Sequence, residues 1–153
     1  PDILRESNTD RIKQFTTELS ALGGQVYQTS TPTQDVIEFL KSRGLSNILL
    51  EPNTLDESLL QKADIEFTHK VDPKILVGVT KAICGLADTG SVLEADSSLL
   101  ASLLPEIHIT ILGKYLSLNF NSITPKIALR NIGIVEITII LWLKMVIAAS
   151  TFS

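Results

Sequence analysis

The sequence predicts an α/β fold in which an open, mainly parallel sheet is flanked by helices. The first observation is that short apolar runs alternate along most of the chain with amphipathic stretches of helical length. Strands separated in this way cannot pair as hairpins, so they are expected to join a parallel sheet through crossover connections. The second is the composition, which is 44% hydrophobic but only 5% aromatic. Such a balance is typical of aliphatic side chains that fill buried strands and helix faces.

The N-terminal half supplies most of the alternation. A helix is expected from an N-cap at Asn8 or Thr9 to about Leu22, because apolar residues recur at helical spacing and two glycines follow. Another helix is expected to begin with Thr31 as N-cap and Pro32 as its first residue. The remaining elements expected here are strands at 25–29 and 46–51, a helix at 54–63, and strands at 64–69 and 75–79.

The C-terminal half is less regular. A short helix is expected to end at Pro105, and a buried strand is expected at 108–113. Residues 115–131 alternate first like a strand and then like a helix that starts at Pro125, and periodicity does not choose between the two.

The segment 132–153 is almost wholly apolar, and its many β-branched residues favour one or two buried strands. A membrane span is disfavoured there, because Glu136 and Lys144 would each cost about 3 kcal/mol near the centre of a bilayer.

The length of 153 residues fits one domain, residues 1–153. Thirteen basic and seventeen acidic residues give a net charge of −4 without a basic run, which argues against nucleic acid as a partner. The single cysteine, Cys84, excludes an intrachain disulfide and any zinc or iron–sulfur centre without ligands from elsewhere. A reducing cytoplasm is the expected location, and no secretory signal is visible at the first residues.

The tetrapeptide Asp88-Thr89-Gly90-Ser91 has the form that presents a catalytic carboxylate in pepsin-like and retroviral aspartic proteases. That mechanism needs two carboxylates that share one proton, and the chain has one such motif, so a protease would have to be a homodimer. Those proteases are all-β proteins with a flap hairpin, whereas helices are expected before this motif. A protease that uses Asp88 is therefore a remote alternative.

A longer stretch, Val77 to Leu112, resembles the LUD-domain family of lactate utilisation protein C (LutC/YkgG-like). Three pieces carry the resemblance, and their order and spacing match those of the family. They are Gly78-Val79-Thr80 with Ala82-Ile83, then Ala87-Asp88-Thr89-Gly90-Ser91, and then Ser102-Leu103-Leu104-Pro105 with His108-Ile109. The late Gly-Pro-Ser-like loop of the family does not occur after Ile132, so 132–153 is atypical or truncated.

The resemblance implies an open, mainly parallel α/β sheet of the NagB/RpiA/CoA-transferase-like kind. It also implies an accessory or small-molecule-binding subunit in the oxidation of L-lactate, an organic acid, to pyruvate. Iron–sulfur clusters are then expected in partner subunits and no cofactor in this chain, which agrees with its one cysteine. An enzyme of the same fold group that acts on a CoA-ester or a sugar-phosphate-like anion is the alternative.

Six residues are candidates for binding a small anionic ligand. Thr80 follows the expected strand 75–79, and ligands of open α/β sheets gather at the carboxyl ends of strands. Thr80 could instead cap a short helix at 81–87. The backbone N–H groups and hydroxyls of Thr89, Gly90 and Ser91, with Asp88 as a polar or acid/base group, could hold an anion or form an ordinary turn.

His108 is the sixth candidate, as a proton donor. A structural role is favoured for it and for His69, and no metal site is expected, because neither has the spacing of a metal ligand.

Overall fold

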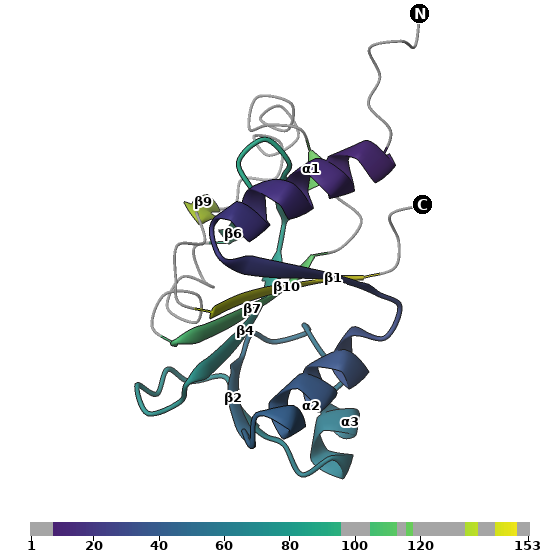
Figure 1. Ribbon diagram of the computed structural model, residues 1–153. Coiled ribbons are helices and arrows are strands. Elements are labelled where there is room, and N and C mark those ends of the chain that lie inside the picture. The colour runs from purple at the N-terminus through teal and green to yellow at the C-terminus, as the bar shows by residue number, and fades with distance from the viewer. Residues whose placement is uncertain (1–7, 96–104, 113–115, 118–133, 138–142, 150–153) are drawn as a thin grey trace, which may run out of the picture.

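The computed structural model describes residues 8–95, 105–112, 116–117, 134–137 and 143–149 (Figure 1). Its elements alternate helix and strand as far as β3, and every later element among the described residues is a strand. They are α1 (Asn8–Ala21), β1 (Gly24–Thr29), α2 (Pro32–Ser42), β2 (Asn47–Leu50), α3 (Glu57–Lys62), β3 (Glu66–Thr68), β4 (Val77–Ala82), β5 (Cys84–Leu86), β6 (Ser91–Ala95), β7 (Ile107–Leu112), β8 (Leu116–Ser117), β9 (Ile134–Ile137) and β10 (Leu143–Ala149).

The main sheet has six strands in the order β1-β10-β7-β4-β2-β3, and every neighbouring pair is parallel. This confirms the α/β fold with an open, mainly parallel sheet. The strand β10 lies inside the sheet between β1 and β7 and pairs with each over six residues. Its place explains why the end of the sequence is so apolar, since an inner strand of a parallel sheet is buried on both faces.

The described residues of the segment 132–153 form two strands, β9 and β10, as expected. No helix in the described part of the chain is both long enough and apolar enough to cross a membrane. The helix expected before Pro105 and the segment 118–131 lie outside the described residues.

Helices cover the two faces of the main sheet (Figure 1). On one face, buried residues of α2 and α3 pack on β2, β4 and β7. These are Val36, Ile37, Leu40 and Leu60 against Ile48, Leu50, Val77, Val79, Ile109 and Ile111. On the other face, Phe15 and Leu19 of α1 pack with Ala82, Val92 and Leu112. Two apolar cores thus hold the helices on the sheet, and burial of each large side chain contributes about 1.5–3 kcal/mol.

A second sheet, with the order β8-β5-β6-β9, is the main departure from the sequence prediction. Its centre is an antiparallel hairpin in which Cys84 pairs with Leu93 and Leu86 with Ser91. The short helix considered at 81–87 is wrong, because these residues form the end of β4 and all of β5. Gly85 disfavours a helix there, and the strand pairing satisfies the backbone groups instead.

Two further expectations need correction. The strand expected at 75–79 runs from Val77 to Ala82, because β4 pairs with β7 along all six of these residues. Thr31 precedes α2 as expected, but its side chain makes no capping hydrogen bond. Pro32 in the first turn begins the helix, and the Thr31 carbonyl accepts from the Asp35 amide.

The N-terminus of α3 has a stronger cap. Asp56 accepts hydrogen bonds from the Ser58 amide at 3.0 Å, the Ser58 hydroxyl at 2.6 Å and the Leu59 amide at 3.3 Å. The Ser58 hydroxyl first, and then the Leu59 amide, lower the pKa of the Asp56 carboxyl below its usual value of 3.8. A carboxylate with a lowered pKa stabilises the fold above the unfolded value, and this stabilisation is lost as the pH falls through the folded value.

We expect Asp56→Asn to keep the cap and lose this pH dependence, because an amide oxygen accepts the same hydrogen bonds but does not titrate. The difference in urea midpoint between wild type and variant should be largest near neutral pH and shrink below about pH 4. Asp64→Asn is the control, since the Asp64 side chain accepts no hydrogen bond within the described structure. A difference for Asp56→Asn that does not change between pH 7 and pH 3 would contradict this explanation.

Candidate functional site

Four polar side chains meet in the interior between the two sheets. They are Thr80 of β4, Glu94 of β6, and His108 and Thr110 of β7, and each residue is 0% exposed. Thr80 and Thr110 are register partners in the main sheet. Polar groups buried in this way are costly unless they bond to one another.

The four side chains form one hydrogen-bonded cluster, which we call the buried polar cluster. The Thr80 and Thr110 hydroxyls both donate to Glu94 Oε1, at 2.5 Å and 3.2 Å. His108 Nε2 lies 2.7 Å from the Thr80 hydroxyl and 3.0 Å from that of Thr110. It also lies 3.4 Å from Glu94 Oε1.

The supply of protons in the buried polar cluster fixes the tautomer of His108. A hydroxyl has one proton to donate, and those of Thr80 and Thr110 both go to Glu94. When Glu94 is a carboxylate, His108 Nε2 is therefore the nitrogen that carries a proton and donates to the two hydroxyl oxygens. The other ring nitrogen, Nδ1, is buried and has no hydrogen-bond partner in the described structure.

The residues beside His108 in the main sheet are Gly78 of β4 and Lys144 of β10, its register partners on the two sides. Lys144, the basic residue of the apolar segment 132–153, thus lies beside His108 in the main sheet.

The Asp88–Ser91 tetrapeptide lies apart from the buried polar cluster, in the turn of the β5–β6 hairpin. The tetrapeptide forms a turn, one of the two roles considered for it, and it joins two strands of the second sheet. Asp88 and Thr89 are exposed, whereas Gly90 and Ser91 are buried. The Thr89 hydroxyl donates to Ser91 Oγ at 2.8 Å, the Ser91 amide donates weakly to Thr89 Oγ1 at 3.4 Å, and the Gly90 amide donates to the Leu86 carbonyl at 2.9 Å. The amides of Gly90 and Ser91 are therefore engaged within the turn.

Gly90 is required by packing and by its backbone conformation. Its φ is +69°, and a Cβ there would lie 2.6 Å from the Leu19 amide nitrogen of α1. The turn therefore lies directly against the backbone of α1. The close approach that the glycine allows is to this helix.

The six sequence-predicted residues thus fall in two places. Thr80 and His108 come together, but Thr80 lies inside β4 and not at its carboxyl end. Ser91 and Glu94 lie on opposite faces of β6, because side chains alternate along a strand. The turn therefore lies at the start of β6, and Glu94 brings the buried polar cluster to the other end of the same strand.

Sequence reasoning missed Glu94 and Thr110. One signal for Glu94 was an acid within the apolar run 91–95, and one for Thr110 was its spacing two residues after His108, on the same face of a strand.

His69 and Cys84 are the other side chains that were considered for a chemical role. His69 Nδ1 lies 2.7 Å from the Leu50 carbonyl oxygen, and its Nε2 lies 3.3 Å from Glu57 Oε1. Cys84 is buried, which raises the pKa of its thiol to about 11, so the thiol stays protonated at neutral pH. The described residues contain no group of three or more His, Cys, Asp or Glu side chains that could hold a metal ion.

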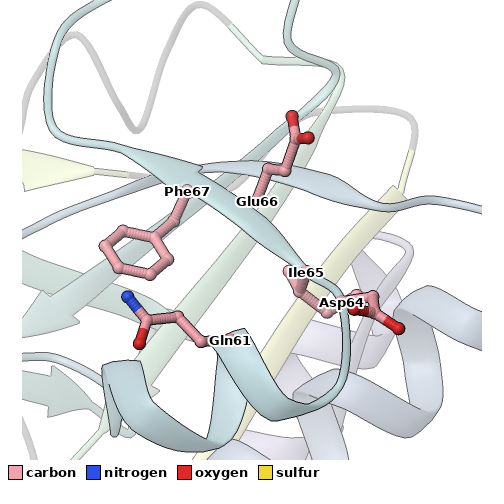
Figure 2. Close-up of a pocket in the computed structure, with 5 residues that line it drawn as sticks. All are labelled: Gln61, Asp64, Ile65, Glu66 and Phe67. Carbon is pink, nitrogen blue, oxygen red and sulfur yellow. The ribbon is translucent and has the colours of Figure 1, made fainter.

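An open pocket of about 550 Å³ lies elsewhere, at the β3 edge of the main sheet (Figure 2). Gln61, Asp64, Ile65, Glu66 and Phe67 line it, and Figure 2 shows the Phe67 ring beside the Gln61 side chain. None of the six predicted residues, and no member of the buried polar cluster, lines this pocket.

Substituting Gly90 should destabilise the protein more than substituting Gly44, which provides a matched control. Both glycines have a positive φ, +69° and +67°, but a Cβ at Gly44 would meet nothing within 4 Å. We expect Gly44→Ala to cost about 1–2 kcal/mol from backbone strain, and Gly90→Ala to cost about 1–3 kcal/mol more from overlap with α1. Urea unfolding measures both, and equal losses would show that the contact with α1 is unimportant.

The buried polar cluster should behave as one energetic unit. We expect Thr80→Val and Thr110→Val each to cost about 1–3 kcal/mol in free energy of unfolding, because each removes a donor to a buried carboxylate. The edge-strand control Thr68→Val, where the half-buried hydroxyl accepts one hydrogen bond from the Lys70 amide, should change it by less than about 1 kcal/mol, because no buried carboxylate loses a donor. In a double-mutant cycle the two cluster substitutions should couple by about 0.5–3 kcal/mol, and strict additivity would contradict a shared network.

No family model matches the sequence, and no curated protein matches it. Among solved structures, the crystal structure of a DUF162 family protein from Deinococcus radiodurans is similar, with a TM-score of 0.72 and 11% identity over 94% of this chain and 99% of that one. DUF162 is the designation of the LUD domain. The chain thus has the fold of a DUF162 family protein along nearly its whole length.

Proposed function

We propose that the chain is a LUD-type accessory subunit, similar to lactate utilisation protein C, that works with iron–sulfur partner proteins in the oxidation of L-lactate to pyruvate. One observation carries the proposal. The stretch that resembles the family, Val77 to Leu112, contains every member of the buried polar cluster. It also contains the Asp88–Ser91 turn that leads into β6. The shared fold with a DUF162 family protein supports it.

An accessory role fits the geometry better than catalysis by this chain. The four groups of the buried polar cluster are closed off from solvent and bonded to one another. Such a cluster fixes the position of β6 against β4 and β7, and with it the turn that β6 carries. On this account Asp88 and Thr89, which are exposed, are the groups that a ligand or a partner subunit meets.

Redox chemistry would belong to the partner proteins. A [4Fe–4S] or [2Fe–2S] cluster is held by several thiolates, and the sequence has one cysteine, whose thiol is buried. The chain would contribute its surface and any binding of the organic acid, and the clusters would carry the electrons.

The alternative, an enzyme acting on a CoA-ester or a sugar-phosphate-like anion, depended on free amides in the turn. The amides of Gly90 and Ser91 donate within the turn instead, and the carboxylate of Asp88 is adjacent. Both features weaken an anion site at this position. The remote alternative of an aspartic protease requires an all-β fold, which this α/β chain does not have.

Deleting the gene should abolish growth of the source organism on L-lactate as sole carbon source and leave growth on pyruvate unchanged. Affinity-tagged wild-type chain should restore growth and co-purify with proteins that contain iron and inorganic sulfide. The tagged Gly44→Ala variant should do both as well, since Gly44 is remote from the turn. Normal growth of the deletion strain on L-lactate, together with elution of the tagged chain free of iron, would refute the proposal.

A further inference from the structure

The two edges of the main sheet differ in how well they resist pairing with another strand. The edge strand β3 has three residues, begins with Glu66 and follows Asp64. Short length and charge are the usual protection of a sheet edge. The opposite edge strand, β1, has six residues, and its sequence, GQVYQT, contains no charge and no proline. No strand in the described part of the chain pairs with its outer side.

Side chains along β1 are exposed on the face of the sheet that carries α2. Gln25 and Tyr27 align through β10 with Ile109 and Ile111, which pack under α2 and α3. Both β1 residues are nevertheless exposed, and Tyr27 is 44% exposed. The Tyr27 hydroxyl donates to Gln25 Oε1 at 2.8 Å, so the polar ends of these side chains are satisfied while the ring stays open.

We propose that the outer edge of β1 is an interface at which two copies of this chain pair their β1 strands antiparallel, extending the main sheet across a two-fold axis. The axis stands perpendicular to the sheet, so residues of like face come opposite one another. In one register, Val26 of one copy lies opposite Val26 of the other, and Gln25 lies opposite Tyr27. In the next register, Tyr27 of one copy lies opposite Tyr27 of the other. In both registers the strand pairs apolar, aromatic and amide side chains, which suit cross-strand contacts.

A second copy is a better occupant than a different protein because the strand is neutral and complementary to itself. Amide and hydroxyl groups both donate and accept, so Gln25 can bond to the residue opposite it in either register, which is Tyr27 in the first and Thr29 in the second. No like charges meet within the pair, since β1 has none. A strand pair buries less than the roughly 800 Å² per partner of a standard interface, so the dimer should be weak and its population should depend on concentration.

Sedimentation equilibrium of the purified chain tests the proposal. The apparent mass should rise toward twice the monomer mass between about 5 and 500 μM, as expected for a weak interface. In Gln25→Lys/Tyr27→Lys, like charges lie directly opposite in either register, so the dissociation constant should rise at least about tenfold. The control Asn47→Lys/Gln61→Lys adds the same charge at exposed positions near the β3 edge and should dimerise as wild type does.

Hydrogen exchange of wild type supplies a second reading that needs no variant. Outward amides of β1 should exchange more slowly at high protein concentration than at low, while the β3 edge should not change. A monomer throughout the range, or a dimer unaffected by the two lysines, would overturn the proposal. So would β1 amides that are protected equally at every concentration, because the edge would then be covered by the chain itself.

Discussion

The position of β10 is the constraint on which the rest of the main sheet depends. In this sheet β1 has β10 as its one described neighbour, and β7 reaches β1 only through β10. The pairing joins Gly24 to Lys144 and Thr29 to Ala149, which are far apart in the sequence. Contacts of such separation carry a large loop-closure cost and slow folding. Until β10 is in place, β1 and β7 both present open edges.

Within the described residues, contacts of different kinds hold the second sheet against the rest of the fold. The buried polar cluster joins β6 to β4 and β7 through directional hydrogen bonds, and Gly90 brings the hairpin turn against the backbone of α1. The apolar cluster that contains Phe15, Leu19 and Val92 lies on the same side. Position along β6 is therefore set from both ends of the strand, and the exposed Asp88 and Thr89 are held at a defined place on the surface.

Much of the fold could be predicted from the sequence because it follows from periodicity. Apolar runs separated by helices indicated the parallel sheet, and the β-branched segment 132–153 indicated strands. The β5–β6 hairpin could not be predicted in the same way, since Lys81 to Ala87 is too short for any period to choose between helix and strand. Within the candidate site, Thr80 was identified by its place after an expected strand, and His108 was identified by its residue type. Glu94 and Thr110 left weak local signals in the sequence, but their contact with Thr80 and His108 is a tertiary fact that no local pattern shows.

The proton count in the buried polar cluster also bears on how such a chain can diverge in sequence. Both threonine hydroxyls donate their one proton to the same oxygen of Glu94, and both hydroxyl oxygens accept from His108 Nε2. Losing one member leaves a buried group of another unpaired, whereas replacing all four together by apolar residues leaves none. The four positions are thus expected to be inherited as a set and exchanged as a set.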